Sequence, residues 1–569
     1  MKKLLIVISF FIFLSPLTFA QSWVTGISPT NNAHSVSKDI QIQAVFDRGI
    51  NPLTLSDSTI FVYGSRSGYS NTGIVYNSMD MSVTISPLSD FKDGEEVTVS
   101  LTTGIKDSTG ANMPVPYSFS FIIQSNPGTV EFLQINTISV SSVPYILTSA
   151  DFNMDGFQDI ATANRGSNNI SILINNGTGN FSIANTIPVG TRPEYIISGD
   201  FDRDNDFDLA VINAGNNNCF ILTNTSGSFL VTDTILLGNS PHTVNTRDIN
   251  GDGYLDLVAS NFGGGSIAVM LNDKNGSFTA PVNINSGSGP EIPLLHDLNN
   301  DGSFDMALSN FNSANVYIFF NDGFGIFSQQ DIISTGNSPH LSASGDLNND
   351  GFVDLVVPEF GSNNITLLFN DSLGGFSNTS FIPAPGGPWS GSTSDLDGDG
   401  DMDLAVTKYN SAQVSVYSND GTGLFTQTVS PGVGVKPHLV ISADFNNDGV
   451  MDLAVCNETS NSVSILLNEP SVGIQNISSN IISSYDLYQN YPNPFNPSTT
   501  ISFDIRISGF TELKIYDVNG KLVSNPISEN LSHGKYSYNF NASNLSSGVY
   551  YYSIISGEYT QTKKMILLK

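Results

Sequence analysis

The amino-acid sequence predicts an all-β protein in which a seven-bladed β-propeller is flanked by two smaller β-sandwiches. Three observations support this prediction. An aspartate-rich nonapeptide recurs seven times at intervals of 48 or 49 residues. Short apolar runs of strand length surround each copy. Gly, Asn, Ser and Thr are abundant, whereas charged residues make up only 13% of the chain, a balance typical of turn-rich sheet proteins.

Length and charge limit the classes of protein and of partner. A chain of 569 residues is too long for one hydrophobic core, and a prior of about 150 residues per domain predicts three or four units. The 52 acidic residues outnumber the 21 Lys and Arg residues, which gives a formal net charge of −31. Nucleic-acid binding needs clustered Lys and Arg, so we expect no nucleic-acid partner. Cations are the natural counterpart, and we expect a monomer.

Residues 1–20 have the features of a secretory signal peptide. Two lysines precede an apolar run from Leu4 to Leu14, and Ala20 stands at a small-residue cleavage position. The run is too short to span a bilayer, and no later stretch approaches the roughly 20 apolar residues of a membrane helix. We therefore expect an exported, soluble protein without a transmembrane segment.

The nonapeptides mark the repeating unit of the propeller. "DFNMDGFQD" is the first copy, and the seven copies begin at Asp151, Asp200, Asp248, Asp297, Asp346, Asp395 and Asp444. Such a regular period indicates one supersecondary unit stacked on itself, as a solenoid or a propeller. Each unit contains four short strand patterns, such as "EYIISGDF" before a nonapeptide and "DLAVIN" after it. Four antiparallel strands in a unit of about 50 residues form the blade of a propeller.

The ends of the repeat region predict how the propeller closes. A Phe follows the Gly turn before the fourth strand at Phe181, Phe229, Phe278, Phe327, Phe376 and Phe425. The seventh copy, Phe132, lies one period before Phe181, whereas the last repeat stops after its third strand. An open propeller would leave two unpaired strand edges. We therefore expect the first strand of the region to complete the last blade.

The nonapeptide has the ligand spacing of a hard-cation loop. In "DLNNDGFVD", residues 346–354, oxygen-bearing side chains occupy positions 1, 3, 5 and 9, and Gly351 permits a sharp turn at position 6. In one repeat Asn205 takes this place, and Asn also tolerates a left-handed turn. Position 12, where a helical EF-hand needs a bidentate Glu, holds residues that cannot ligate. The loops therefore join strands, and their calcium would be structural.

These repeats resemble the FG-GAP/VCBS family of calcium-loop propellers over residues 129–470. The resemblance implies about one Ca²⁺ per blade and carries the ligand set over to each loop. Solvated Asp and Asn turns without an ion are the alternative, which repulsion between so many carboxylates disfavours. The implied ligands are Asp151, Asn153, Asp155, Asp159, Asp200, Asp202, Asp204, Asp208, Asp248, Asn250, Asp252, Asp256, Asp297, Asn299, Asp301, Asp305, Asp346, Asn348, Asp350, Asp354, Asp395, Asp397, Asp399, Asp403, Asp444, Asn446, Asp448 and Asp452.

A second set of residues recurs with the same period. Each follows a proline at the start of the first strand of a blade, so the set should encircle one mouth of the central channel. Its members are Tyr145, Glu194, His242, Glu291, His340, Trp389 and His438, which we call the channel ring. The ring has two interpretations. It closes a water-filled channel, or it binds a ligand, with Trp389 and Tyr145 stacking on a sugar and the His and Glu groups forming hydrogen bonds or binding a transition metal.

Catalytic motifs are lacking elsewhere in the sequence, and we assign no catalytic residue. There is no nucleophile elbow, zinc motif or phosphate loop. Glu194 and Glu291, on neighbouring blades, are the one pair that could serve in glycoside hydrolysis. Cys219 and Cys456 stand where sibling repeats carry apolar residues, so we expect both to be buried and no disulfide to form.

Two flanking regions resemble other known domains. Residues 22–125, with "DIQIQAVFD", "INPLTL" and a late "KDSTG" turn, read as a β-sandwich and resemble bacterial Ig-like domains related to surface-layer proteins. That resemblance implies a spacer or a weak binding module. A polar linker, 471–484, leads to residues 485–569, where "YPNPFNPSTTISF", "LKIYDVNGKLV", "LSSGVYYYSI" and "KKMILLK" resemble the type IX secretion sorting domain. This tail should itself be a small β-sandwich.

The sorting-domain resemblance implies recognition by the type IX secretion machinery and a place outside a Gram-negative cell, secreted or on the surface, with removal of the tail. The leading hypothesis is a calcium-stabilised propeller for binding or adhesion to a glycan or protein ligand, in preference to an enzyme. The alternative hypothesis is a polysaccharide-active enzyme, a lyase or hydrolase, with its site at the channel mouth. A purely structural surface component is a third reading, and it predicts no saturable ligand.

Overall fold

The computed structural model describes residues 22–469, 474–478, 484–531, 533–542, 545–557 and 559–568. Over these residues the chain is built of strands, with one short 3-10 helix, η1 (Pro52–Thr54). It divides into two compact units, Met1–Glu469 and Pro470–Lys569. The predicted signal peptide, residues 1–20, lies outside the described residues.

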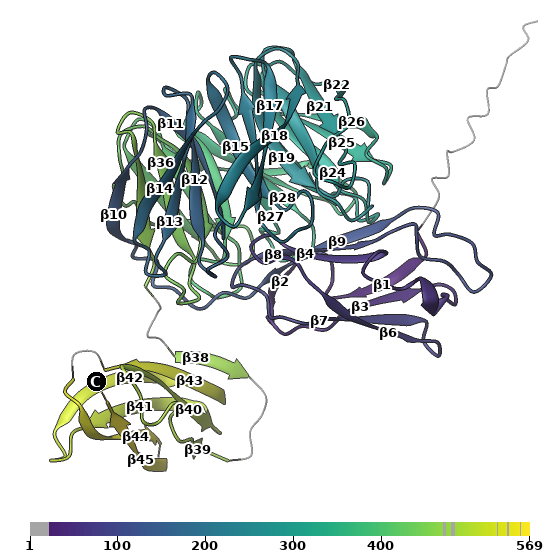
Figure 1. Ribbon diagram of the computed structural model, residues 1–569. Coiled ribbons are helices and arrows are strands. Elements are labelled where there is room, and N and C mark those ends of the chain that lie inside the picture. The colour runs from purple at the N-terminus through teal and green to yellow at the C-terminus, as the bar shows by residue number, and fades with distance from the viewer. Residues whose placement is uncertain are drawn as a thin grey trace, which may run out of the picture. The chain divides into compact units, whose positions relative to one another are not determined.

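Seven four-stranded sheets in the described part of the first unit form the propeller (Figure 1). Six blades each consist of four consecutive antiparallel strands. Their strands are β11 (Pro144–Ala150), β12 (Asp159–Asn164), β13 (Asn169–Asn175) and β14 (Phe181–Pro188) in blade 1; β15 (Pro193–Gly199), β16 (Asp208–Asn213), β17 (Asn218–Thr225) and β18 (Ser228–Leu236) in blade 2; β19 (Pro241–Arg247), β20 (Asp256–Asn261), β21 (Ser266–Met270) and β22 (Val282–Asn285) in blade 3; β23 (Pro290–His296), β24 (Asp305–Asn310), β25 (Asn315–Asn321) and β26 (Phe327–Ser334) in blade 4; β27 (Ala343–Gly345), β28 (Asp354–Glu359), β29 (Asn364–Phe369) and β30 (Asn378–Pro383) in blade 5; and β31 (Pro388–Ser394), β32 (Asp403–Lys408), β33 (Gln413–Asn419) and β34 (Phe425–Val429) in blade 6.

Blade 7 combines strands from the two ends of the repeat region. It contains β35 (Pro437–Ala443), β36 (Asp452–Asn457), β37 (Ser462–Leu467) and β10 (Leu133–Ser139). The antiparallel register places Ile138 opposite Val463. The prediction that the first strand of the region completes the last blade is therefore confirmed.

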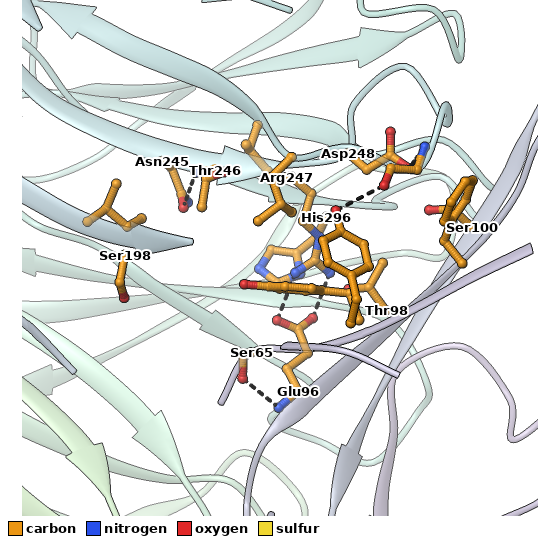
Figure 2. Close-up of a pocket in the computed structure, with 17 residues that line it drawn as sticks. Ser65, Glu96, Thr98, Ser100, Ser198, Asn245, Thr246, Arg247, Asp248 and His296 are labelled. Atoms are coloured by element: carbon orange, nitrogen blue, oxygen red, sulfur yellow. Dashed lines mark hydrogen bonds and ion pairs between the residues drawn. The ribbon is translucent and has the colours of Figure 1, made fainter. Parts of the chain in front are cut away.

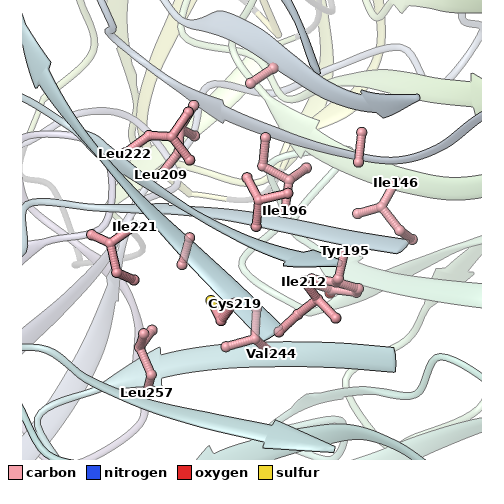
Figure 3. Close-up of a cluster of buried hydrophobic side chains, with 14 of the residues drawn as sticks. Ile146, Tyr195, Ile196, Leu209, Ile212, Cys219, Ile221, Leu222, Val244 and Leu257 are labelled. Carbon is pink, nitrogen blue, oxygen red and sulfur yellow. The ribbon is translucent and has the colours of Figure 1, made fainter. Parts of the chain in front are cut away.

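Burial explains the sequence pattern within each blade. The second strand, such as β12 or β28, is buried along its whole length, whereas the fourth strand, such as β14, is mostly exposed. A strand covered by neighbouring blades on both faces reads as a continuous apolar run instead of an alternating one. Figure 3 shows one such core, in which Ile146, Ile196 and Val244 come from three successive blades. Cys219 lies in this cluster as a free, buried thiol.

The N-terminal domain is a two-sheet sandwich. One sheet contains β1 (Val24–Ser28), β3 (Ile42–Phe46), β7 (Ser82–Pro87) and β6 (Thr72–Asn77). The other contains β2 (Ala33–Val36), β9 (Tyr117–Ile123), β8 (Glu96–Leu101), β4 (Ile60–Gly64) and β5 (Gly68–Tyr69). Trp23, Phe46, Phe119 and Phe121 fill the space between the sheets.

This domain packs on the end of the propeller that carries the acidic loops. The backbone N–H of Ser118 donates to the carbonyl of Gly302 at 2.7 Å, and the hydroxyl of Tyr69 donates to the carbonyl of Gly253 at 2.9 Å. Both glycines occupy position 6 of a loop. The Ig-like domain, which the resemblance implied to be a spacer or a weak binding module, thus packs against the loops at this end of the propeller.

The second unit is a small sandwich of two four-stranded sheets among the described residues. One contains β38 (Ile474–Ser478), β43 (Gly534–Asn541), β40 (Ser498–Ile505) and β39 (Asp486–Leu487), and the other β42 (Leu522–Leu531), β41 (Gly509–Tyr516), β44 (Gly548–Ser556) and β45 (Tyr559–Leu567). Phe503, Leu513 and Tyr552 lie in its core. Strand β38 falls within the predicted linker 471–484, so part of that segment belongs to the sandwich.

Candidate metal and ligand sites

Each acidic loop joins the first and second strands of a blade, and its backbone folds around its own side chains. In the loop 346–354, the N–H of Gly351 donates to Oδ2 of Asp346 at 2.7 Å and the N–H of Asp350 donates to Oδ1 at 3.1 Å. Gly351 has a φ of +87°, the left-handed conformation that glycine adopts freely. Asn205 holds the same conformation in the second loop, with a φ of +72°.

The aspartate at position 9 is the first residue of the second strand in every blade. Asp354 shows its setting: Oδ2 accepts the N–H of Leu347 at 3.1 Å, and Oδ1 accepts the N–H of Asn370 at 2.8 Å. The same two bonds recur in all seven blades. Position 9 is therefore fixed by the sheet, while positions 1, 3 and 5 lie in the loop.

The second loop shows most clearly that the residues fit a divalent cation. Asp200, Asp202 and Asp208 each present a carboxylate oxygen within 4.8 Å of the others. Burial, together with the neighbouring carboxylates, raises the pKa of Asp208 to about 8. Oδ1 of Asp200 is buried and has no hydrogen-bond partner in the described structure. A hard cation would supply the missing partner and balance the charge. A second cluster of this kind consists of Asp395, Asp397 and Asp399.

Sequence analysis did not single out seven asparagines that connect the loops. Each lies within two residues of the end of the third strand of a blade, and its side-chain amide donates, at 2.7 to 2.9 Å, to the carbonyl at position 2 of the preceding blade's loop. They are Asn175, Asn224, Asn272, Asn321, Asn370, Asn419 and Asn468. Their spacing of 48 or 49 residues was the signal that could have revealed them.

The structure brings all seven channel-ring residues together at the opposite end of the channel. His242 lies between two carboxylates: its Nδ1 is 3.0 Å from Oε2 of Glu194, and its Nε2 is 3.4 Å from Oε2 of Glu291. His340 packs against Trp389, with ring centroids 4.0 Å apart and the ring planes tilted by 34°. The remaining pair, Tyr145 and His438, has centroids 3.7 Å apart. The ring is therefore a packed cluster, not an open pore.

Charge within the cluster is unevenly balanced. Glu194 also contacts Arg192 at 2.6 Å and Arg165 at 3.2 Å through Oε1. Burial opposes the charging of His242, but Glu291 and Glu194 outweigh it and raise its pKa to about 10. Burial lowers the pKa of His340 to about 4. Neither oxygen of Glu291 has a hydrogen-bond partner among the described residues.

A cavity of about 170 Å³ lies above the cluster, a size that admits a small polar group. Ring residues form part of its wall, and the other lining residues are Arg165, Arg192, Ser240, Phe262 and Phe311. Arg165, Phe262 and Phe311 each directly follow the second strand of a blade, so they form a second periodic set that sequence analysis missed. Aromatic side chains and two arginines therefore line the cavity.

A second cavity, of about 240 Å³, lies between the Ig-like domain and the propeller (Figure 2). Glu96 of β8 and Arg247 of β19 form a bidentate ion pair across it, at 2.7 and 2.8 Å. His296 lies beside this pair, and its Nε2 is 2.8 Å from Oγ of Ser344. This ion pair links the two domains, and each of its two charged groups has the other as its partner.

Fold and loops together define a seven-bladed β-propeller with an acidic loop in every blade. Family models match a bacterial Ig-like domain over residues 21–122 and a secretion system C-terminal sorting domain over residues 489–568. An FG-GAP-like repeat model matches residues 151–211, 200–259, 248–308, 297–357, 346–406 and 395–455. The repeat matches extend over more than half of the chain, which therefore belongs to the FG-GAP-like repeat proteins. The sorting domain makes it a secreted or cell-surface protein.

Solved structures also match the chain at low identity. BBS1N in complex with ARL6DN is 13% identical, with a TM-score of 0.46, and the match covers 60% of this chain and 98% of that one. A putative 6-phosphogluconolactonase from Bacteroides uniformis is 14% identical, with a TM-score of 0.41 and coverages of 59% and 92%. The periplasmic gluconolactonase PpgL of Pseudomonas aeruginosa is 15% identical, with a TM-score of 0.38 and coverages of 70% and 99%. No curated protein matches the chain.

No helix among the described residues has the length and apolar character needed to cross a membrane.

Proposed function

We propose that this protein is a calcium-stabilised binding or adhesion protein, exported by the type IX secretion system and acting outside the cell as a monomer. Calcium in the seven loops, at the 28 residues of positions 1, 3, 5 and 9, would hold the propeller rigid. The ligand, a glycan or a surface protein, would bind at the channel ring.

The observation that carries this proposal is the convergence of the ring. Trp389 and Tyr145 come from blades 6 and 1, which blade 7 separates, and both line the cavity together with two arginines and two glutamates. A pocket that combines aromatic side chains with a few charged hydrogen-bonding groups is a common kind of ligand site in proteins. The Ig-like domain covers the opposite end, which leaves the ring as the accessible mouth.

The enzyme alternative has less support from the same geometry. A glycosidase needs one carboxyl group that is protonated and able to donate. Glu194 is paired with Arg165, Arg192 and His242, and despite its burial these groups keep its pKa below its ordinary value. It is therefore poorly suited to be a general acid.

A glycan array probed with the calcium-loaded protein tests the proposal. Saturable retention that Trp389→Ala removes, and that Phe324→Ala leaves unchanged, would support it. Phe324 is a suitable control because it is an exposed aromatic residue in a turn of blade 4, outside the ring. Release of shortened saccharides would favour the enzyme, and absence of any ligand on the array and among surface proteins would favour a purely structural component.

A further inference from the structure

Three buried residues of the ring lie close enough to share one ion. They are His242 on β19, Glu291 on β23 and His340, which precedes β27, and they come from three consecutive blades. One potential ligand atom from each lies within 4.8 Å of the others. The exposed fractions are 8%, 0% and 3%, so the cluster is shielded from bulk water.

Glu194 orients His242 toward this point. A carboxylate only accepts hydrogen bonds, so the contact of 3.0 Å assigns a proton to Nδ1 of His242. The other ring nitrogen, Nε2, then faces Glu291. A carboxylate on one nitrogen of a histidine is the usual support of a histidine that binds metal through its other nitrogen.

The distances match ligands around an ion better than they match hydrogen bonds. Nε2 of His242 and Nδ1 of His340 are 3.4 and 3.7 Å from Oε2 of Glu291, beyond the 2.7–3.2 Å of N–H···O bonds. In a tetrahedral zinc site with bonds of about 2.1 Å, neighbouring ligand atoms are about 3.4 Å apart. The spacing of the three residues is therefore close to that of a first coordination sphere.

Buried polar atoms without partners point to the same place. Both oxygens of Glu291 and both nitrogens of His438 lack hydrogen-bond partners in the described part of the chain. The ring of His438 lies 6.1 Å from that of His340. A buried carboxylate without a donor is unfavourable, and a bound cation would provide what Glu291 lacks.

We propose that His242, Glu291 and His340 bind a divalent transition metal of the zinc class, with Glu194 as a positioning residue. Two imidazoles and one carboxylate favour such a metal over calcium, which prefers oxygen ligands. The N–H of Leu341 donates to Nδ1 of His340 at 3.0 Å, so this nitrogen is unprotonated, and a metal would take the lone pair that now accepts the hydrogen bond. A fourth position would remain for water or a ligand oxygen from the cavity.

This inference goes beyond the proposed function, because the metal can be held whatever the propeller binds. It also competes with a simpler arrangement, in which a doubly protonated His242 bridges Glu194 and Glu291. The two arrangements make opposite predictions, since a proton and a metal cannot occupy the same nitrogen.

Metal titration of the untagged, full-length exported chain tests the proposal. The protein is stripped with a chelator, returned to millimolar CaCl₂ so that the loops are filled, and titrated with ZnCl₂ by calorimetry and with CoCl₂ by visible absorption. We expect one saturable equivalent and the visible spectrum of four- or five-coordinate cobalt. Glu291→Gln and His340→Gln should abolish this binding, and Glu194→Gln should weaken it about 10- to 100-fold.

Trp389→Phe is the matched control, because it keeps an aromatic ring in the cluster and removes no metal ligand. It should retain the metal even where it loses a glycan, which separates failure of this inference from failure of the proposed function. The melting temperature in calcium establishes that each variant is folded. A folded wild-type chain that binds neither Zn²⁺ nor Co²⁺, and whose His242 shows two ring N–H signals by NMR, would overturn the proposal.

Discussion

The side-chain amide of Asn175 in blade 1 donates a hydrogen bond of 2.8 Å to the carbonyl oxygen of Phe445 in blade 7. In the sequence the two residues are separated by almost the whole propeller, but in space their blades are neighbours. The contact repeats the one that links every other pair of adjacent blades. It fastens the acidic loops of the first and last blades to each other. The ring closure therefore depends on side chains near the loops as well as on the shared strand.

Asn175→Ala should destabilise the propeller by about 1–3 kcal/mol, because it leaves buried carbonyl groups without a donor. Besides Phe445, the amide donates to the carbonyl of Gln158 at 3.0 Å. Urea unfolding in calcium measures the effect. Asn275→Ala, in an exposed turn of blade 3, is the control and should change the free energy of unfolding by less than about 0.5 kcal/mol. Equal effects of the two substitutions would contradict the role of Asn175.

Removal of calcium should lower the melting temperature by on the order of 10 °C. Millimolar calcium at sites with a dissociation constant near 0.1 mM would add about 1–2 kcal/mol each, with an upper limit near 10 kcal/mol for seven independent sites. Differential scanning calorimetry before and after EGTA measures this change. Added Ca²⁺ should restore the original value, whereas Mg²⁺ should restore less of it. An unchanged melting temperature together with metal-free protein would exclude calcium from the loops.

The Glu96–Arg247 pair should couple the Ig-like domain to the propeller. It is bidentate and its side chains are 29% and 12% exposed, so we expect a coupling free energy of about 1–2 kcal/mol in a double-mutant cycle with Glu96→Gln and Arg247→Met. Lys38 and Asp93, a more exposed pair at 2.6 Å, provide the comparison and should give less than about 1 kcal/mol. A coupling no greater than that of the exposed pair would mean that Glu96 and Arg247 do not hold the domains together.

Glu96 should also make the free energy of unfolding depend on pH. Burial opposes its charging, but Arg247 outweighs burial and lowers the pKa of Glu96 from 4.5 to about 2. The pKa of Glu96 is lower in the folded protein than in the unfolded chain. The contribution of Glu96 to the free energy of unfolding is therefore complete above pH 4.5 and is lost as the pH falls toward 2. The difference in unfolding free energy between wild type and Glu96→Gln should therefore shrink from pH 5 to pH 3. A constant difference over that range would be inconsistent with the lowered pKa.

The two cysteines should not react in the folded protein. Both are buried, and burial raises the pKa of Cys219 to about 12, so thiolate is scarce at neutral pH. A thiol reagent at pH 8 should label neither residue in calcium and both in guanidinium chloride. Labelling of neither thiol in the denatured, unreduced chain would reveal a disulfide.

Most of the architecture could be predicted because a period of 48 or 49 residues repeats the same physical requirements. Phe132, one period ahead of its siblings, indicated how the propeller closes, and the ring residues could be placed on one end by their shared position after a proline. The strand β38 could not be foreseen, since residues 474–478 pair with β43 far along the chain and carry little local signal.

Contacts between elements were also beyond the reach of sequence periodicity. The seven asparagines have the right spacing, but Asn is so common in this chain that its role appears only when the preceding blade is placed beside it. The contact between the Ig-like domain and the propeller could not be predicted for the same reason. Glu96 contacts Arg247, 151 residues later, and the sequence around neither residue indicates that the two lie close together. Occupancy by metal depends on the ions around the protein as well as on its residues.

The shared strand of blade 7 has a consequence for the order of assembly. β10 emerges early from a ribosome or an export channel, but its partner β37 follows more than 300 residues later. Until β37 has formed, β10 and the incomplete last blade both expose unpaired strand edges to other chains. Closure of the propeller is therefore necessarily a late event. Truncation before Ser462 would leave an open propeller whose last blade is incomplete. We expect this form to aggregate even though six blades are intact.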